Sequence, residues 1–414
     1  MKKFFFIFSF IFASILFINF EKIEEKVTSK FPNFRFVKYL FKSNSLVNNI
    51  SNDYNVKFLP YTEFAKLNLK KIKIRFQDEY YTPPSDQSVS YKQYGTFFIE
   101  LYNEKLILID FLGNISSIDY DNNFLNKSVK NPKINHIEKN LNVSRVFDSL
   151  VIDDNLYISY TTKKNNCQKI NISSAKINYE KLVFKKFFQS DSCFKTGSPN
   201  RMQYFTHNSK NGILLSTASG SYDDPGNEAQ NKESLFGKIL FIELKSRKKH
   251  LYSYGHRVIQ GLYAKDDLIL STEHGPKAGD EINKILFENN YGWPVASYGE
   301  KYNFSYGEKP TYKKNHYSLG FTEPLFSFIP AVGISEIIKL PNNFSDHLQD
   351  KFIVSSLNGR SIFFVSFDKE FNRVINLEKI FINERIRDLK YDLKNKIILL
   401  ALEENGEIGI LSAN

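Results

Sequence analysis

The sequence has few of the residues that mark several common protein classes. Its 414 residues include only two cysteines and one tryptophan. It contains no CxxC pair and no Cys/His spacing that fits a zinc site, which excludes the usual zinc-binding motifs. G-x-S-x-G, Walker A and H-E-x-x-H are absent, as is a G-x-G-x-x-G that follows a strand. The common hydrolase, nucleotide-binding and metalloprotease signatures are therefore excluded too.

Long helical patterns are also nearly absent after residue 70, and short apolar runs separated by polar turns take their place. The aromatic content of 15% favours strands. Such a pattern predicts an all-β sandwich, barrel or propeller. About 340 residues would divide into six units of roughly 57, which suits propeller blades with long loops. The clearest runs are residues 71–76, 96–101, 105–110, 113–118 and 151–160.

One long apolar run stands at the N-terminus. Met1-Lys2-Lys3 precedes the apolar residues 4–20, and no clear small-x-small cleavage site comes before Glu21. This pattern predicts an export signal in residues 1–20, either cleaved or kept as a membrane anchor. Both alternatives place the protein in the periplasm or elsewhere outside the cytoplasm. We interpret residues 21–70 as a spacer or helical segment, with packing against the first unit of the β domain to close it as the alternative, and 71–414 as the β domain.

The cysteines and the charge suggest a compartment and exclude one partner. In an oxidising compartment, the even pair Cys167 and Cys193 suggests one disulfide, and two partly buried free thiols are the alternative. The formal charge of +11 is spread along the chain. No RNP, zinc-finger or helix-turn-helix pattern accompanies it, so we expect no nucleic-acid partner.

The stretch from Ser271 to Tyr298 organises the chain. An apolar strand over 267–272 is broken by Glu273-His274-Gly275-Pro276, because proline cannot donate to a ladder and glycine allows close approach of a ligand. A second break, 289–294, contains the single tryptophan, Trp293. Two such breaks around a short strand, with carboxylates between them, are typical of an ion or cofactor corner.

These residues carry a resemblance to a known family. E-H-G-P-x-x-G-D-E-[IL]-N followed by N-Y-G-W-P is similar to the signature of the soluble glucose/sorbosone (aldose sugar) dehydrogenases. That family consists of six-bladed β-propellers that use pyrroloquinoline quinone (PQQ) and calcium, so the resemblance implies this fold. It extends over roughly residues 140–414, through the segments 211–217, 228–231, 237–240, 255–262, 356–360 and 385–388. In the segment 255–262, Val258 replaces the family's asparagine.

The resemblance implies two calcium sites. The carbonyl groups of Gly275 and Pro276 would hold the calcium that contacts the cofactor. Glu281 and the main chain of Tyr291 match a second, structural calcium site. Oxygen ligands of this kind are those that calcium prefers.

The resemblance also implies cofactor contacts at one mouth of the propeller channel. Arg257 would lie beside the quinone carbonyl, where a fixed guanidinium stabilises the charge that develops as hydride arrives. Gln260 would hydrogen-bond near the same place. Arg385 and Arg387, two apart on a strand, share one side and would bind PQQ carboxylates. We expect Arg257, Gly275, Arg385 and Arg387 to line this mouth.

Two family positions are changed. The family's general base is the histidine of H-x-G-G-R, and Gly197 occupies that position, four residues before Arg201. The lysine of a second cofactor segment is replaced by Asn358. His207 is a weak substitute for the base, and His274 suits a packing role.

The sequence therefore supports two functions. The first is an exported PQQ- and calcium-dependent dehydrogenase, with Arg257 in the catalytic role, that acts on a sugar or aldehyde and passes electrons to an external acceptor. The second is a catalytically degenerate propeller that acts as a ligand-binding or scaffold protein.

Overall fold

The computed structural model describes residues 67–74, 95–126, 132–165, 167–194, 200–220, 224, 227–302 and 309–413. The expected signal over residues 1–20 and all of the spacer except its last four residues lie outside this part of the chain. Within the described ranges, no helix is long and apolar enough to cross a membrane. The helices there are the short α4 (Asn122–Asn126) and the 3₁₀ turn η3 (Tyr317–Leu319).

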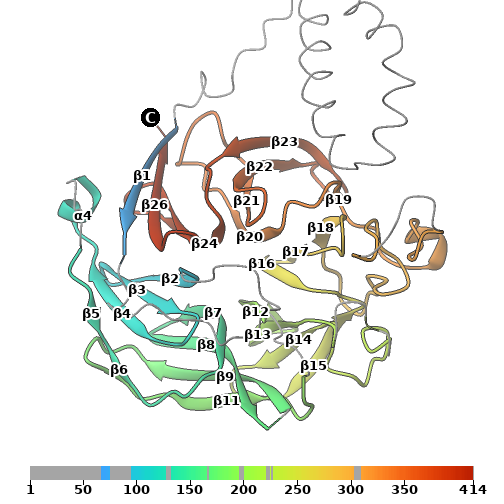
Figure 1. Ribbon diagram of the computed structural model, residues 1–414, viewed down its shortest axis with the longest axis horizontal. Helices are drawn as coiled ribbons and strands as arrows, with labels where there is room; N and C mark the ends of the chain where they lie inside the picture. The colour runs from blue at the N-terminus through green and yellow to red at the C-terminus, as the bar shows by residue number, and fades with distance from the viewer. Residues whose placement is uncertain are drawn as a thin grey trace, which may run out of the picture. The chain divides into compact units, whose positions relative to one another are not determined.

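Six four-stranded antiparallel sheets surround a common axis, which confirms the all-β six-bladed propeller (Figure 1). The first three blades contain β2 (Phe97–Tyr102), β3 (Lys105–Asp110), β4 (Ile115–Asp119) and β5 (Asn135–His136); β7 (Arg145–Ile152), β8 (Asn155–Lys164), β9 (Cys167–Lys176) and β11 (Lys185–Gln189); and β12 (Met202–His207), β13 (Lys210–Thr217), β14 (Lys238–Glu243) and β15 (Lys249–Tyr254). The next two contain β16 (Ile259–Lys265), β17 (Leu268–Glu273), β18 (Asp280–Lys284) and β19 (Phe326–Phe328); and β20 (Ile334–Lys339), β21 (Phe352–Ser356), β22 (Ser361–Phe367) and β23 (Val374–Phe381). A small parallel pair, β6 (Glu138–Lys139) and β10 (Lys181–Leu182), links the first two blades.

The sixth blade joins the two ends of the described chain. It contains β24 (Ile386–Asp392), β25 (Ile397–Leu402), β26 (Glu407–Ala413) and, as its outer strand, β1 (Leu67–Lys73). The β1 strand pairs with β26 from Leu67↔Ala413 to Lys73↔Glu407. It therefore begins four residues before the boundary expected from the sequence, and it closes the ring. Each inner strand, β2, β7, β12, β16, β20 and β24, contacts the next around the channel.

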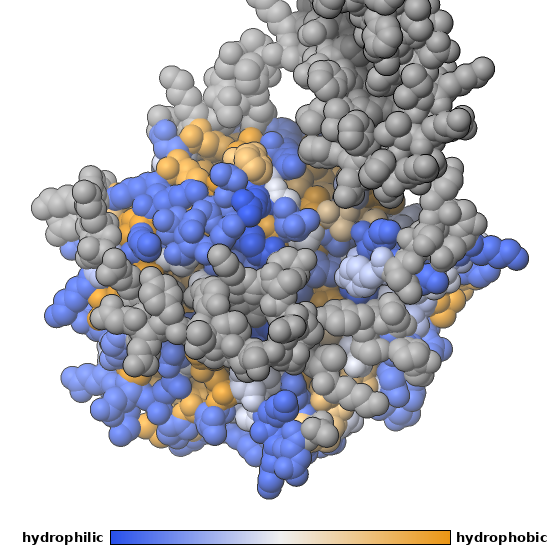
Figure 2. Space-filling view, viewed as in Figure 1, coloured by the Kyte–Doolittle hydropathy of each residue, from blue (hydrophilic) through white to orange (hydrophobic). Residues whose placement is uncertain are grey.

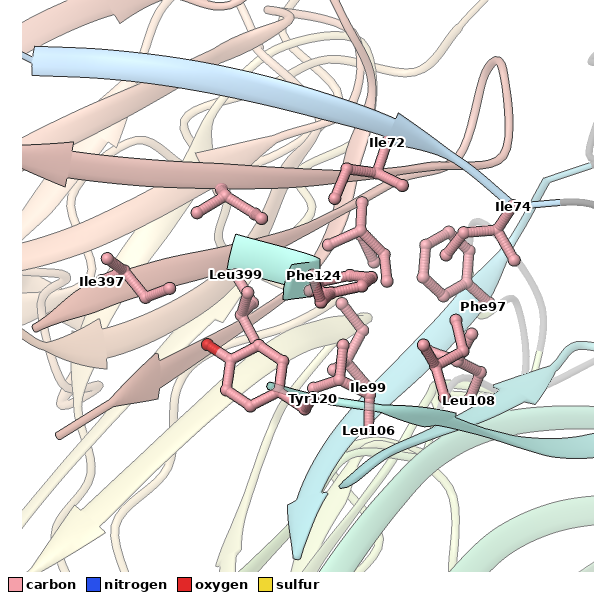
Figure 3. Packing of buried hydrophobic residues seen from close by; sticks show 14 residues of the cluster. Ile72, Ile74, Phe97, Ile99, Leu106, Leu108, Tyr120, Phe124, Ile397 and Leu399 are labelled. Atoms are coloured by element: carbon pink, nitrogen blue, oxygen red, sulfur yellow. The ribbon is translucent and has the colours of Figure 1, made fainter. Parts of the chain in front are cut away.

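A hydrophobic cluster seals the closure between the sixth and first blades (Figure 3). Ile72 of β1, Phe97 of β2, Leu108 of β3 and Leu399 of β25 are all buried in it. Alternate residues of a strand point to the same face, so each strand presents an apolar row to the neighbouring blade. Burying one such side chain stabilises the fold by about 1.5–3 kcal/mol. This cluster holds the N-terminal strand and the first blade against the C-terminal blade.

The apolar run over residues 151–160 is a hairpin and not a single strand. The β7 strand ends at Ile152, and β8 begins at Asn155. Asp153 has a φ of 51°, a left-handed conformation that aspartate tolerates better than most residues. The aspartate pair in the middle of this run was the signal for a turn.

The cysteines form the expected disulfide. Cys167 and Cys193 are bonded with Cα atoms 5.0 Å apart, inside the limit of about 7 Å for a bridge. Next to the bridge, the N–H of Phe194 donates to the Gln168 carbonyl at 2.7 Å, and the N–H of Gln168 donates to the Phe194 carbonyl at 3.2 Å. The bridge thus holds the chain that leaves the second blade against β9, shortly before it enters the third blade.

Removal of this bridge should destabilise the propeller. The two cysteines are 26 residues apart in sequence. Removing a cross-link that closes a loop of this size costs about 3 kcal/mol of stability. We expect the Cys167→Ser, Cys193→Ser double variant to unfold at a clearly lower urea concentration than the oxidised wild type. Reducing agent should lower the wild-type midpoint toward that of the double variant and leave the double variant unchanged. Equal midpoints for the oxidised wild type and the double variant would contradict this.

Candidate cofactor and active site

The residues that the sequence singled out meet at one end of the channel. Arg257 directly precedes the inner strand β16, which carries Gln260, and Gly275 follows β17, the neighbouring strand. Because β16 and β17 are antiparallel, with Ile259 opposite Glu273, the start of the first strand lies beside the end of the second. Arg385 and Arg387 stand at the start of the inner strand β24.

Arg257 is held rigidly at this end. It is only 3% exposed, and its Nη1 donates to the carbonyl oxygens of Gly275 at 2.8 Å and His274 at 3.2 Å. Its main-chain N–H bonds to the Glu273 carboxylate. The guanidinium carbon also lies 5.1 Å from the centre of the Trp293 ring. The strand break at Glu273 to Pro276 therefore serves to present two carbonyl groups to Arg257.

Trp293 lies against Arg257 because the segments around Gly255 and Gly292 pack closely together. The N–H of Trp293 donates to the carbonyl oxygen of Gly255 at 2.9 Å. Gly255 has a φ of +78°, and a Cβ on it would lie 2.8 Å from the nitrogen of Gly292. Any other residue at Gly255 would be strained and would push the tryptophan segment away from Arg257.

A buried glutamate that the sequence analysis did not identify organises the other two arginines. Glu403, 1% exposed, accepts hydrogen bonds from Nε of Arg385 at 2.8 Å and Nε of Arg387 at 2.7 Å. The Thr96 hydroxyl donates to the same carboxylate at 3.0 Å. Burial opposes ionisation of Glu403, but the guanidinium groups of Arg387 and Arg385 outweigh it and lower its pKa to about 2. The carboxylate is therefore charged, and it orients both guanidinium groups.

Arg387 links this group to β16. Its Nη1 donates to the side-chain oxygen of Gln260 at 3.2 Å. Arg387 and Gln260 therefore lie together, and Arg385 and Arg387 share one side of the chain, as their spacing indicated. A signal for Glu403 was present in the sequence, because it directly follows the buried strand β25, much as Glu273 ends β17.

A second charged cluster is centred on Arg201, which lies just before the inner strand of the third blade and pairs with carboxylates of other blades. Arg201 is 4% exposed and contacts three carboxylates from other blades: Asp148 at 3.4 Å, Asp388 at 3.5 Å, and Glu336. The carboxylate of Asp148 also accepts the main-chain N–H of Met202 at 2.6 Å. Burial raises the pKa of Asp148 to about 6, against the opposing charge of Arg201. Arg201 thus connects four blades through their inner strands.

A cavity of about 280 Å³ lies on the other side of this cluster. It is lined partly by Arg201 and Gln203 and partly by residues from the later halves of the other inner strands, among them Leu150, Tyr263, Lys339 and Tyr391. Lys390, which bonds Glu100 at 3.1 Å, forms another part of its wall. The cavity and the arginine group are therefore at opposite ends of the channel.

Comparison with known proteins gives this chain a family. Residues 141–410 match the family model described as glucose/sorbosone dehydrogenase. The chain belongs to this family. The match includes Arg257, Glu273 to Pro276, Arg385, Arg387 and Glu403.

Individual relatives are more distant. Over 197 residues, the chain is 29% identical to an uncharacterized protein of Synechocystis and 26% identical to the aldose sugar dehydrogenase YliI of Escherichia coli. Each alignment covers 44% of this chain, and 46% and 52% of the two relatives. The chain thus spans about half the length of these relatives. A shorter stretch of 59 residues is 44% identical to quinoprotein glucose dehydrogenase B of Acinetobacter calcoaceticus, covering 14% of this chain and 12% of that protein.

Solved structures of sugar dehydrogenases share the fold. A glucose dehydrogenase superposes with a TM-score of 0.64 at 16% identity, covering 76% of this chain and 95% of that one. The apo form of the Escherichia coli aldose sugar dehydrogenase gives 0.59 at 17% identity, covering 77% and 95%. The PQQ-bound aldose sugar dehydrogenase of Streptomyces coelicolor gives 0.53 at 17% identity, covering 77% and 93%. At these identities the likeness establishes the propeller fold.

Two positions that differ from the family pattern are Gly197 and Asn358. Gly197 lies outside the described residues, although Asn200 and Arg201 are within them. Asn358 is exposed in the turn between β21 and β22.

His207 stands at the hairpin end of β12, opposite Lys210, which is about 20 Å along the strand from Arg201. Its ring packs with Phe205, Phe241, Tyr252 and Phe287. The structure therefore rules out His207 as a substitute base.

The first predicted calcium site uses the main-chain carbonyls of Gly275 and Pro276. The Gly275 oxygen, like that of His274, accepts a hydrogen bond from the Arg257 guanidinium. Calcium prefers such hard oxygen donors. Among the described residues, no three His, Cys, Asp or Glu side chains are grouped so as to hold a metal ion. The predicted ligands at Gly275 and Pro276 are main-chain carbonyl groups, not side chains.

The second predicted calcium site also fits a cation. Glu281 on β18 lies opposite Glu273 on β17. Removal from water and the Glu273 carboxylate raise the pKa of Glu281 well above its usual range. The ring of Tyr291 stacks 4.6 Å from that of His256, whose Nδ1 is 3.1 Å from Glu273, so His256 lies between Tyr291 and this pair. A divalent cation would relieve the repulsion between the two carboxylates.

Proposed function

We propose that this protein is an exported PQQ- and calcium-dependent dehydrogenase that oxidises an aldose at its anomeric carbon. The observation that carries the proposal is the group of Arg257, Arg385 and Arg387 at one end of the propeller channel, beside the carbonyl groups of His274 and Gly275. Three guanidinium groups suit a ligand with several carboxylates. The export pattern of residues 1–20 supports a location in the periplasm or elsewhere outside the cytoplasm, with an external electron acceptor.

When bound, PQQ would supply the two-electron acceptor that no side chain of this protein provides. The carbonyls of Gly275 and Pro276 would hold the accompanying calcium. Arg257 would stabilise negative charge as it develops, since its hydrogen bonds to Gly275 and His274 keep it fixed. Arg385 and Arg387, oriented by Glu403, would hold carboxylate groups of the ligand.

A ligand-binding propeller without catalysis is the second candidate. Gly197 supports it, because glycine cannot accept the proton of the sugar hydroxyl. Asn358 supports it as well, since an amide replaces the charged lysine of the family. Under this proposal, the arginine group would bind an anionic ligand and no turnover would follow.

Binding of PQQ to the full-length chain tests the proposal. Trp293 is the only tryptophan and lies against Arg257, so we expect PQQ with calcium to quench its fluorescence. Arg257→Ala should weaken binding about 10- to 100-fold, because it removes one charged hydrogen-bonding group. The control is Arg373→Ala, whose side chain is exposed and paired with Asp368. Absence of PQQ binding in calcium would overturn the dehydrogenase proposal, whereas binding without aldose oxidation would favour the second candidate.

A further inference from the structure

Tyr302 lies beside the proposed reaction site. Its ring centre is 5.9 Å from the guanidinium carbon of Arg257, and its side chain is 58% exposed. Trp293, in the same long segment between β18 and β19, lies 5.1 Å from that carbon and is buried. One aromatic ring therefore packs Arg257 into the protein, while the other extends from Arg257 to the solvent.

Exposure alone gives no reason to single out an aromatic residue. On the face shown in Figure 2, hydrophilic side chains cover most of the described surface, and hydrophobic ones form separate smaller areas. Single exposed apolar residues are normal on protein surfaces. Tyr317, in the same segment, is 82% exposed and is part of the turn η3. Tyr302 differs from Tyr317 by its contact with Arg257.

We infer that Tyr302 is a substrate-binding residue that stacks against the ring of a pyranose substrate; this rests on the proposed function. A pyranose presents C–H groups on its faces and hydroxyl groups around its edge. The face of an aromatic ring carries partial negative charge and attracts such C–H groups. The Arg257 guanidinium lies over one face of the Tyr302 ring, so a sugar stacked on the other face would lie one ring away from Arg257, at the exposed edge of the proposed reaction site.

The phenol ring, not the hydroxyl group, supplies this interaction. Stacking should therefore survive Tyr302→Phe and be lost in Tyr302→Ala. Tyr302 stabilises the substrate complex as a whole, so its loss should affect binding more than the chemical step. Because the side chain is mostly exposed, neither substitution should change the fold.

Binding of methyl β-D-glucoside to the full-length chain loaded with PQQ and calcium tests this inference. The blocked anomeric oxygen prevents oxidation of this sugar, so equilibrium dialysis measures binding without turnover. We expect Tyr302→Ala to raise the dissociation constant about three- to tenfold. The KM for glucose should rise by a similar factor, with kcat and PQQ affinity within about twofold of wild type. Tyr302→Phe and the matched control Tyr317→Ala should bind like wild type.

Three results would overturn the inference alone: unchanged glucoside binding in Tyr302→Ala, equal weakening in Tyr317→Ala, or a loss of kcat at unchanged KM. Failure of the proposed function is recognised in the wild type itself. If the wild-type chain binds PQQ but neither oxidises an aldose nor binds the glucoside, the proposed function fails and this inference fails with it.

Discussion

Arg201→Met should lower the free energy of unfolding by about 3–5 kcal/mol, the usual effect of removing one partner from a buried ion pair. Methionine fills much of the same volume but leaves Asp148, Glu336 and Asp388 without their common cation. These carboxylates come from the second, fifth and sixth blades, so their repulsion acts on the whole inner ring. Urea unfolding of the full-length chain measures the change.

The matched control is Arg373→Met, which removes an exposed ion pair with Asp368. An exposed pair contributes at most about 1 kcal/mol, so this variant should unfold close to wild type. Equal effects of the two substitutions would show that the Arg201 cluster does not hold the blades together.

The loss in Arg201→Met should shrink as the pH falls. Burial already raises the pKa of Asp148 to about 6 in the presence of Arg201, and removal of that cation raises it further. A group with a raised folded-state pKa stabilises the fold at low pH, and this contribution is lost as the pH rises through that pKa. The difference between wild type and variant should therefore be smaller at pH 5 than at pH 8. A constant difference would mean that lost packing, not charge, explains the effect.

Gly197→His should raise dye-linked aldose oxidation about 100- to 10,000-fold, the usual contribution of a positioned general base. Removal of hydride from the anomeric carbon requires an acceptor for the hydroxyl proton, and glycine has none. Among the family positions, Gly197 is the one where a base is missing, and the structure places His207 at the far end of β12. Initial rates with PQQ, calcium and an artificial electron acceptor measure the change.

Gly197→Ala is the control, since it alters the backbone freedom without supplying a base. It should leave the rate near the wild-type value, and His207→Ala should do the same. PQQ affinity should change little in any of these variants, because Arg257, Arg385 and Arg387 remain. A wild-type rate around 10 per second, unaltered by Gly197→His, would show that another group accepts the proton.

Much of the fold and part of the candidate site could be predicted from local sequence. The runs at 97–102 and 105–110 are short continuous apolar runs bounded by turns, a pattern of strands that are buried on both faces, and most of their residues are buried. The run over 151–160 contains two strands joined by a turn at Asp153, a division that the list of apolar runs did not make. The Cys167–Cys193 pairing was predictable from the cysteine count and the export pattern.

The group at the channel end is a mixed case. Gly275 lies in the stretch from Ser271 to Tyr298 and Arg257 in the segment 255–262, and the family resemblance of both predicted that they lie together. The contact of Trp293 with Arg257 was not predicted. The partnership of Arg385 and Arg387 with a single carboxylate did not follow from it. Their spacing indicated a common side of the strand, but not that Glu403 would lie between them and Thr96.

Local sequence was enough to predict most strands, to suggest the disulfide and to carry the family signature, because each depends on residues in one or two short segments. Only the tertiary structure showed that β1 completes the sixth blade, that Arg201 joins four blades, and that Tyr302 lies beside Arg257. Thr96 and Glu403, for example, are 307 residues apart in sequence. Such contacts form only when all six blades close into a ring, and no local pattern of side chains records which distant residue will lie opposite.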